Sequence, residues 1–495
     1  MKNLTLDNIA FATGGVLYGT LEEEQKEVSS VTTDSRKVEP GCLFIPIVGE
    51  RADGHNYIDQ AAGKGALAVL SERVLEKPPC PYILVESSLQ AVKDIAKFYL
   101  SGLSIPVVGV TGSVGKTSTK EAIASVLSQK YNTLWTEGNF NNELGLPLTI
   151  FRLREEHQIA VLEMGISDFG EMSRLADVAR PSLAVITNIG TCHLENLGDR
   201  EGVFRAKTEL FAYVKNGGHV VLNGDDDKLV RLKDACAEEM SPDADMKEGS
   251  LEFRARQLGG KGIRPVFFGM GETNDVYADG IESRGLLGTT CRIHLFGQEF
   301  TVNIPIPGNH MVQNALAASA VGYLCGLTTE EIRAGLEKQQ ALGGRFRMVQ
   351  TEKFLIVDDC YNANPMSMKA SLNVLHDGGG RRVAVLGDMG ELGKDEEELH
   401  RQVGVHAAEC GIDLLICAGT LCRSMAEAAK EAAAARQKAG TAAEGAVPPL
   451  QVVYFPDRET LLRELPDYIE EKDTILVKAS RFMKFEEVVE KLKTL

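Results

Sequence analysis

A short glycine loop at residues 112–117 (GSVGKT) has the residue types and spacing of a phosphate site. Its glycines would let backbone N–H groups converge on phosphate oxygens at a helix start, its lysine supplies a cation, and its threonine offers a hydroxyl to Mg²⁺. The strict phosphate-loop pattern needs glycine at position 110, where this chain has Val110, so the loop is a shortened form. A tight turn of no function is the alternative. We predict that the loop binds phosphate.

A Mg²⁺ ion near this loop would need hard oxygen ligands. Glu163 follows the apolar run 159–162, and His193 lies a few residues beyond the apolar run 183–186. The carboxyl ends of parallel strands meet at one edge of a sheet, so both side chains should lie near the loop. A lone histidine is more often structural, and its position at this edge is what favours function. We predict Thr117, Glu163 and His193 as metal ligands.

The central elements that must position these residues are apolar runs alternating with helical patterns. Strands are predicted at 105–110, 159–162, 183–186 and 220–222, and a helix at 116–130, which together indicate a parallel sheet. Residues 236–262 are charged and aperiodic, and we predict an inserted surface segment there. Residues 263–306 are typical of short antiparallel strands that extend the sheet or form a side layer.

The flanking regions complete a three-domain α/β chain. Residues 1–103 contain short β-like runs at 42–48 and 66–70 with a turn entering a helix between them, which predicts a small mixed α/β domain. Residues 104–343 form the central domain of P-loop type. In residues 344–495 the alternation restarts, with strands at 354–357, 383–386, 414–417, 452–454 and 474–477, and indicates a Rossmann-like domain. The Ala-rich run 426–446 is predicted to be a helix with a loose end.

Composition excludes several other classes. The 495 residues exceed what one core usually supports, and the formal net charge of −17 disfavours nucleic acid and anionic membranes as partners. The ten cysteines show no metal-binding spacing and are predicted to be reduced. We see no signal peptide and no apolar run of about 20 residues, so we expect a soluble cytoplasmic protein.

These residues resemble the Mur ligases, which build the peptide stem of peptidoglycan. The loop is similar to that family's ATP loop, and Glu163 and His193 fall where the family places Mg²⁺ ligands. The resemblance implies that ATP is bound by Thr111, Gly112, Ser113, Val114, Gly115, Lys116, Thr117 and Ser118. The segment 206–211 resembles one whose lysine, here Lys207, is carbamylated in several members. An ordinary helix lysine is the alternative, and whether Lys207 is carbamylated stays open at this point.

Further stretches extend the resemblance along the chain. Residues 308–318 resemble a helix start whose asparagines, here Asn309 and Asn314, approach adenine, although asparagine is also a common helix cap. Residues 344–345 and 358–365 resemble elements that close over ATP, which implies that Arg345 meets phosphate and that Asp359 and Asn362 lie by the nucleotide. A capped turn is the alternative. The family usually has glycine where this chain has Ala479, which affects only fine loop geometry.

The branch of the family is indicated by residues 137–149. This stretch resembles the branch that joins D-alanyl-D-alanine to UDP-N-acetylmuramoyl-tripeptide, with Asn139, Asn141, Asn142 and Glu143 as implied substrate contacts. Residues 33–36, 40–44 and 53–55 resemble a UDP-binding module, in which Ser35 and Arg36 would serve the diphosphate. Plain turns are the alternative at both places.

The resemblance implies an ATP-dependent amide-bond ligase that acts through an acyl phosphate. Its cofactors would be ATP and Mg²⁺, and we expect a monomer. One alternative is another ligase of the superfamily, either the branch that adds the third stem residue or a folylpolyglutamate synthase, which lacks a first domain like 1–103. Another is a P-loop switch or motor NTPase, and a third is a non-catalytic scaffold. The implied catalytic residues are Lys116, Glu163, His193 and Lys207.

Overall fold

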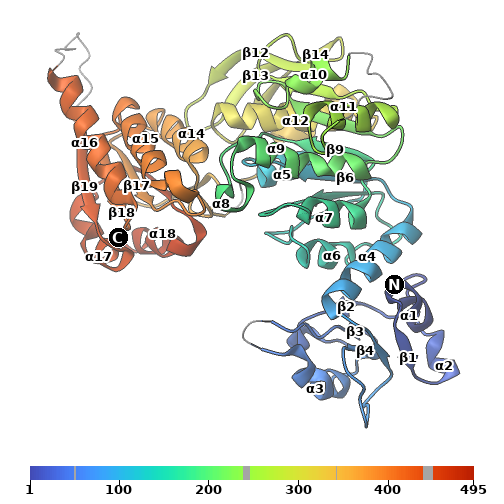
Figure 1. Ribbon diagram of the computed structural model, residues 1–495. Coiled ribbons are helices and arrows are strands. Elements are labelled where there is room, and N and C mark those ends of the chain that lie inside the picture. Colours follow the sequence, from blue (N-terminus) through green and yellow to red (C-terminus); the bar gives the residue numbers. More distant parts are fainter. Residues whose placement is uncertain (50–51, 238–245, 342, 439–449) are drawn as a thin grey trace.

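The computed structural model describes residues 1–49, 52–237, 246–341, 343–438 and 450–495, and they form three α/β units, each with its own sheet (Figure 1). The third unit lies beside the central one, and the first lies below it in this view. The predicted fold class is confirmed. Among the described residues, no helix is both long and apolar enough to span a membrane.

The first sheet has the order β1-β5-β4-β3-β2, and only β1 is antiparallel to its neighbour. Its strands are β1 (Val16–Tyr18), β2 (Val31–Thr32), β3 (Leu43–Phe44), β4 (Ala68–Ser71) and β5 (Tyr82–Leu84). Its helical segments are α1 (Leu6–Thr13), α2 (Leu21–Glu24), η1 (Ser35–Lys37), η2 (Gly54–Tyr57) and α3 (Ile58–Gly63). Helix α4 (Ser88–Leu103) packs against α1 of this unit and against helices of the next, so it joins the two.

The central sheet has nine strands in the order β14-β13-β12-β11-β10-β9-β6-β8-β7. Strands β6 to β12 are parallel, and β13 and β14 extend the sheet in antiparallel fashion. The prediction of short antiparallel strands over 263–306 is therefore confirmed for β13 and β14 but wrong for β11, which pairs in parallel with both of its neighbours. The strands are β6 (Val107–Thr111), β7 (Thr133–Trp135), β8 (Ile159–Glu163), β9 (Leu183–Ile186), β10 (His219–Asn223), β11 (Val266–Gly269), β12 (Val276–Ser283), β13 (Thr289–Leu295) and β14 (Gln298–Ile304).

The helices of this unit correct two predictions. Helix α5 begins at Lys116 as predicted but ends at Leu127 rather than at Lys130. Residues 236–262 were predicted to form an inserted surface segment, of which residues 238–245 lie outside the described part. The prediction is wrong for α11 in this segment, because its Arg254 and Leu258 are buried. The helical segments are α5 (Lys116–Leu127), α6 (Gly145–Ile150), α7 (Glu171–Ala179), α8 (Leu194–Leu197), α9 (Arg200–Thr208), η3 (Glu209–Tyr213), α10 (Arg231–Ala235), α11 (Leu251–Gly260), α12 (Asn309–Leu324) and α13 (Thr329–Glu337).

The third sheet has the order β15-β16-β20-β17-β18-β19, with an antiparallel edge strand β15 that the sequence did not predict. Its strands are β15 (Arg347–Gln350), β16 (Leu355–Asp358), β17 (Arg382–Gly387), β18 (Leu414–Ala418), β19 (Gln451–Phe455) and β20 (Thr474–Lys478). The Ala-rich run forms part of α16, and residues 439–449 lie outside the described part. The helical segments are α14 (Pro365–His376), η4 (Gly393–Asp395), α15 (Glu396–Glu409), α16 (Cys422–Lys438), α17 (Arg458–Glu464), η5 (Leu465–Tyr468), η6 (Arg481–Met483) and α18 (Glu486–Lys493).

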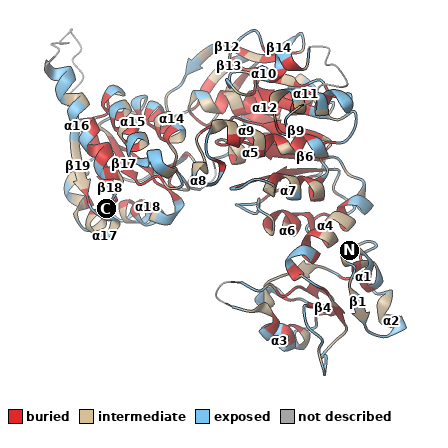
Figure 2. Cartoon of the chain, in the orientation of Figure 1, coloured by how far each residue is buried: buried red, intermediate tan, exposed pale blue. Residues whose placement is uncertain are grey.

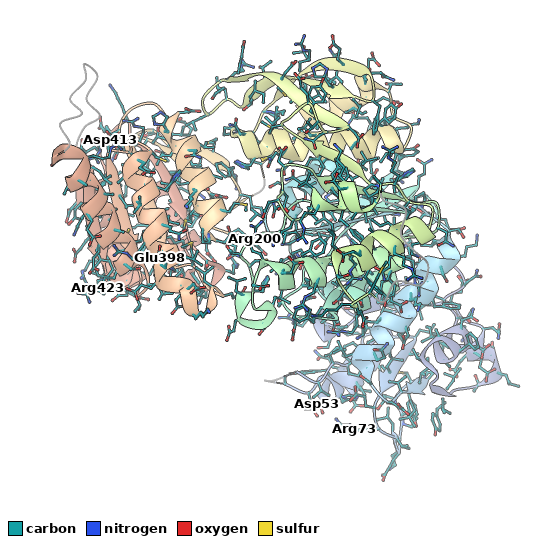
Figure 3. All side chains as sticks on the ribbon, turned by 45° about the horizontal axis from the view of Figure 1, so that its top comes forward. Asp53, Arg73, Arg200, Glu398, Asp413 and Arg423 are labelled. Carbon is teal, nitrogen blue, oxygen red and sulfur yellow. The ribbon has the colours of Figure 1, made fainter. Side chains whose placement is uncertain are left out.

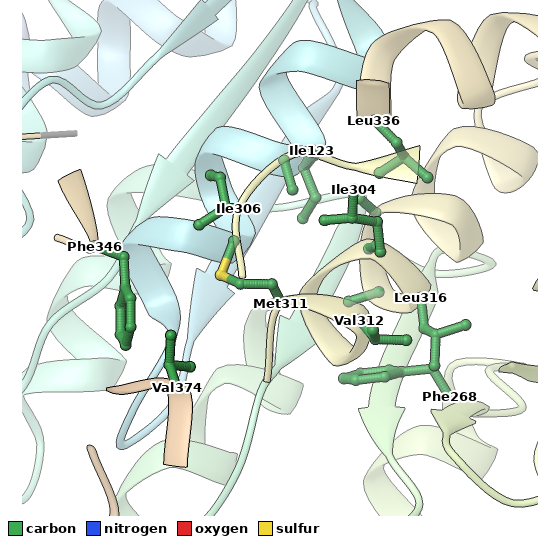
Figure 4. Close-up of a cluster of buried hydrophobic side chains, with 14 of the residues drawn as sticks. Ile123, Phe268, Ile304, Ile306, Met311, Val312, Leu316, Leu336, Phe346 and Val374 are labelled. Carbon is green, nitrogen blue, oxygen red and sulfur yellow. The ribbon is translucent and has the colours of Figure 1, made fainter. Parts of the chain in front are cut away.

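Buried residues concentrate in the strands and on the helix faces that cover them (Figure 2). The inner parallel strands are mostly apolar because helices cover both faces of such sheets, and their polar residues, such as Glu163 and Asp358, lie at the strand ends. One apolar cluster continues from the central unit into the third through Ile306, Met311, Phe346 and Val374, which we call the apolar seam (Figure 4). The two units therefore meet through core-like packing.

Candidate functional site

A cavity of about 880 Å³ lies between the central and third units. Parallel strands of both sheets end at it, which is where open α/β sheets bind ligands. The predicted site residues that line it are Ser113, Val114, Gly115, Lys116, Thr117, Ser118, Asn139, Asn141, Asn142, Glu163, His193, Asn314, Arg345, Asp359 and Asn362.

The glycine loop connects β6 to α5, and its two glycines are sterically required. Gly112 has φ 150°, and a Cβ there would lie 1.9 Å from Thr187 Oγ1. Gly115 has φ 81° and immediately precedes α5. A left-handed conformation of this kind is open to glycine at little cost. The loop therefore presents the N-terminus of α5, with its unpaired N–H groups, to the cavity.

Lys116 and Thr117 begin α5 with their polar groups in the cavity. Lys116 Nζ donates to the carbonyls of Gly112 at 2.7 Å and Ser113 at 3.3 Å. Thr117 Oγ1 lies 3.0 and 2.9 Å from the two carboxylate oxygens of Glu163, which is 1% exposed at the end of β8. Asn141 Nδ2 donates to Glu163 Oε1 at 2.8 Å. Hydroxyl and carboxylate oxygens are thus concentrated beside a phosphate loop, as a hard cation requires.

Asn188, which the sequence did not single out, holds the loop from the next strand. Its Oδ1 accepts the Val114 N–H at 2.9 Å, and its Nδ2 donates to the Val114 carbonyl at 3.0 Å. Ser113 N–H also donates to the Asn188 carbonyl at 3.1 Å. Arg200 steadies the same segment by donating to the Ile189 carbonyl at 2.9 Å (Figure 3). These bonds stabilise a loop that lacks the longer phosphate-loop spacing.

His193 lies just before α8, at the border with the third unit. Its Nδ1 is 2.8 Å from Glu391 Oε2, and both residues line the cavity. The histidine beside it holds the pKa of the Glu391 carboxyl below its usual range. The expected metal ligand His193 is therefore brought to the same cavity as Thr117 and Glu163, and it contacts a carboxylate that sequence reasoning missed.

The wall from the third unit contains a buried ion pair. Lys478 Nζ lies 2.6 Å from Asp359 Oδ2, and the Ser371 hydroxyl donates to the same oxygen at 2.7 Å. Lys478 also donates to the Asn362 carbonyl at 3.1 Å. A carboxylate buried at this depth needs such partners. Asp359 and Asn362 are thus fixed at the cavity by Lys478, whose role the sequence did not reveal.

Arg345 offers a cation from the same wall. Its guanidinium carbon lies 4.2 Å from the centre of the Tyr361 ring. Among the described residues it has no carboxylate or carbonyl partner. Gly344 N–H donates to Asp358 Oδ2 at 3.0 Å, which fixes the backbone beside Arg345. The guanidinium is held by stacking and keeps its five N–H donors for a ligand.

Comparisons with known proteins agree with this geometry. Residues 27–99, 110–322 and 344–481 match the Mur ligase family catalytic domain, the Mur ligase middle domain and the Mur ligase glutamate ligase domain. The chain is 37% identical to the UDP-N-acetylmuramoyl-tripeptide--D-alanyl-D-alanine ligase of Bacillus subtilis over 99% of each chain, and 34% identical to that of Escherichia coli over 96% of each.

The chain belongs to the Mur ligase family. Solved structures similar to this Mur ligase include MurF from Acinetobacter baumannii, with a TM-score of 0.83, 30% identity and coverage of 99% of each chain. A second is MurF from Thermotoga maritima in complex with ADP, with a TM-score of 0.75, 28% identity and coverage of 94% of this chain and 97% of that one.

Lys207 of this Mur ligase lies in α9 and is fully buried. Its Nζ has no hydrogen-bond partner among the described residues. Burial lowers the pKa of the Lys207 amine to about 8. A buried, unpaired ammonium is costly, so this environment favours the neutral amine.

Several predicted residues lie outside the cavity lining. Thr111, at the end of β6, and Gly112, the first residue of the loop, do not line the cavity. Thr111 Oγ1 donates to the Met164 carbonyl at 2.8 Å. Asn309 begins α12 but is exposed, whereas Asn314 accepts a hydrogen bond from Thr119 Oγ1 at 2.9 Å inside the cavity wall. Of the two asparagines, only Asn314 is placed to meet a ligand there.

Glu143 is engaged within the protein. It pairs with Arg174, and its other oxygen lies 4.0 Å from Lys93 Nζ. Asn142 Oδ1 accepts the N–H of Gly145, the first residue of α6, at 2.8 Å. These two contacts shape the 137–149 loop, while Asn139 and Asn141 line the cavity.

The first unit holds Ser35 and Arg36 in η1, away from the cavity. The Arg36 side chain is 85% exposed and bonds Asp34 at 2.8 Å, and Lys64 Nζ donates to the Ser35 carbonyl at 2.9 Å. Asp53 pairs with Arg73 on the same unit (Figure 3). These residues form a polar surface of the first unit.

A buried Asp388, His400 and Cys422 cluster in the third unit could in principle hold a metal. However, His400 Nδ1 lies 2.6 Å from the Glu396 carbonyl, and its Nε2 accepts the Met389 N–H at 2.9 Å. Both ring nitrogens are thus already used. The cluster is a hydrogen-bonded part of the core.

Proposed function

We propose that this Mur ligase joins D-alanyl-D-alanine to UDP-N-acetylmuramoyl-tripeptide at the expense of ATP, for peptidoglycan precursor synthesis. The observation that carries the proposal is full-length similarity to ligases of that name, combined with a phosphate loop that faces Arg345 and Asp359 across one cavity. The products are UDP-MurNAc-pentapeptide, ADP and phosphate.

Each unit has a part in this proposal. Residues 1–103 bind the UDP substrate, with Ser35 and Arg36 near the diphosphate. Residues 104–343 bind ATP through the glycine loop and Asn314, and residues 344–495 close over the nucleotide through Arg345, Asp359 and Asn362. Asn139 and Asn141 contact substrate, with Asn142 and Glu143 holding their loop. We place the enzyme in the cytoplasm as a monomer.

The residues present fit a Mg²⁺ ion. Thr117 and the buried Glu163 supply oxygen atoms within 3.0 Å of each other, and His193 lines the same cavity. Oxygen donors of this kind are what Mg²⁺ prefers. When bound, Mg²⁺ would offset the negative charge of the transferring phosphoryl group.

The reaction proceeds in two steps. The terminal carboxylate of the tripeptide attacks the γ-phosphorus of ATP, the bond from phosphorus to the ADP oxygen breaks, and an acyl phosphate forms. The amine of D-alanyl-D-alanine then attacks the acyl carbon and loses a proton, and phosphate leaves. Lys116 and Arg345 stabilise the charge on the transferring group, and closure of the third unit excludes water that would hydrolyse the acyl phosphate.

We also propose that Lys207 is carbamylated. Its neutral amine adds to CO₂ and loses a proton, which leaves a carbamate with one negative charge. The buried, unpartnered Nζ and its lowered pKa support this step. The carbamate would give α9 an oxygen donor near the metal ligands, so we assign Lys207 a catalytic role.

Phosphate release measured with the UDP-tripeptide, ATP and D-alanyl-D-alanine tests the proposal. Turnover should require all three substrates and yield the UDP-pentapeptide by mass spectrometry. Phosphate release that is unchanged without the dipeptide would indicate a switch or motor NTPase instead. Turnover only with a UDP-dipeptide and a single amino acid would indicate the branch that adds the third residue.

A further inference from the structure

Glu391 brings a carboxylate of the third unit to His193 of the central unit. The 2.8 Å contact joins His193 Nδ1 to Glu391 Oε2, at the point where α8 approaches the third unit (Figure 1). Nothing in the reaction described above uses Glu391. Glu391 nevertheless lines the cavity directly beside His193, an expected metal ligand.

The backbone on both sides is shaped for this contact. His193 has φ 51° and Glu391 has φ 61°, both in the left-handed region that side chains other than glycine rarely adopt. Such conformations persist where the surrounding structure enforces them, and they are common at functional sites. Gly393, which begins η4, packs against α8, since a Cβ there would lie 3.6 Å from Glu195 N. The two loops thus meet along their backbones as well as through the contact between His193 and Glu391.

The contact decides which ring nitrogen of His193 can bind a cation. A neutral imidazole has one N–H and one lone pair. When Nδ1–H donates to the Glu391 carboxylate, Nε2 keeps the lone pair. A carboxylate in this position also fixes the ring orientation and makes the histidine a better ligand.

We propose that Glu391 is the positioning residue for His193, and that it prepares Nε2 to bind the divalent cation of the nucleotide. The proposal rests on the proposed function for the nature of that cation. It also means that the metal site is assembled across the two units. The simpler alternative is an exposed ion pair, since the Glu391 side chain is 65% exposed and pairs of this kind contribute little.

Mn²⁺ binding to the full-length protein with one equivalent of a non-hydrolysable ATP analogue, followed by EPR, separates these readings. We expect Glu391→Ala to weaken Mn²⁺ binding about tenfold and Glu391→Gln to weaken it less, because the amide still accepts the Nδ1–H. The matched control is Glu195→Ala, which removes an exposed carboxylate from α8 close to His193. It should bind Mn²⁺ as the wild type does.

A metal-free measurement provides the second test. In ¹⁵N-histidine-labelled protein, the signals lost in His193→Gln identify His193, and they should show a protonated Nδ1 and an unprotonated Nε2. Glu391→Ala should shift this tautomer balance, whereas Glu195→Ala should not. Mn²⁺ affinity and tautomer both unchanged in Glu391→Ala would overturn the proposal. A wild type that binds Mn²⁺ normally but ligates no dipeptide would contradict the proposed function and leave the role of Glu391 intact.

Discussion

The side-chain amide of Asn188 pairs with both peptide groups of Val114, at 2.9 Å to the N–H and 3.0 Å to the carbonyl. These two hydrogen bonds resemble the pair that two backbone residues exchange in a β-sheet. They connect the end of β9 to the glycine loop. It uses the Val114 N–H, so the phosphate donors must come from the residues that follow it. A shortened loop can therefore keep its shape without glycine at position 110.

Replacing Asn188 should impair nucleotide binding specifically. Asn188→Asp keeps an acceptor for the Val114 N–H but sets a second oxygen against the Val114 carbonyl. Loss of a hydrogen bond to a part-buried peptide group costs about 1 kcal/mol, and the repulsion between the two oxygens adds to this cost. We expect KM for ATP to rise about tenfold, with KM for D-alanyl-D-alanine unchanged. Initial rates measure both constants, and Asn3→Asp, on an exposed residue of the first unit, is the control. Equal changes in the two KM values would count against a role in the loop.

Lys116→Ala should nearly abolish turnover. The Lys116 ammonium donates to the Gly112 carbonyl at 2.7 Å and is therefore held at the loop. Loss of one donor that stabilises charge in the transition state typically lowers kcat at least about 10²-fold. Phosphate release measures the loss, and an unchanged Tm shows that the fold is retained. Lys130→Ala, beyond the end of α5, should keep wild-type activity. Activity retained in Lys116→Ala would remove the central role of this residue.

Lys207 should carry a carbamate whose occupancy depends on pH. With a pKa near 8, the amine becomes increasingly neutral between pH 7 and 9, so at constant CO₂ the modification should increase over that range. ¹³C NMR with labelled CO₂ should show a carbamate signal that Lys207→Arg lacks, and the variant should lose activity. A wild-type spectrum without that signal would leave Lys207 as a buried structural amine.

His310 should make stability depend on pH in a defined window. Burial lowers its pKa to about 4 from the usual 6.5, against the opposing influence of Asp359. Between these values the unfolded chain binds a proton that the folded protein does not, so this contribution is lost as pH falls from 6.5 to 4 and is constant below. The Tm of His310→Gln should fall less steeply over this window than that of the wild type. His219→Gln, at the exposed start of β10, should follow the wild type.

Trp135 should report binding in the cavity. It is the only tryptophan and lines the cavity with Asn139 and Asn141. We expect saturating D-alanyl-D-alanine to change its fluorescence, and Trp135→Phe to abolish the signal. An unchanged emission spectrum would place the dipeptide elsewhere.

The fold was largely predictable because buried parallel strands are short apolar runs. Strand β9 coincides with the predicted run 183–186, and the glycine loop lies between β6 and α5 as its pattern indicates. Strand β15 was missed because an edge strand with a mixed burial pattern has no such run. Helix α11 was missed because its buried residues include the charged Arg254.

The site was less predictable where it depends on contacts between units. No local pattern links His193 to Glu391 or Asp359 to Lys478, since these pairs form only when distant strand ends come together. Glu143 illustrates the opposite case. Its amide-rich surroundings indicate a substrate contact, which stays a prediction, and the structure adds a pairing with Arg174 that no local pattern indicates.

The apolar seam has a mechanical consequence. Pulling the two units apart would expose Met311, Phe346 and Val374 to water, at about 25 cal/mol for each Å² of apolar surface. Rotation about the seam would keep these side chains covered. The third unit can therefore rotate about the seam at little cost in exposed apolar surface, and such a rotation would change the distance between Glu391 and His193.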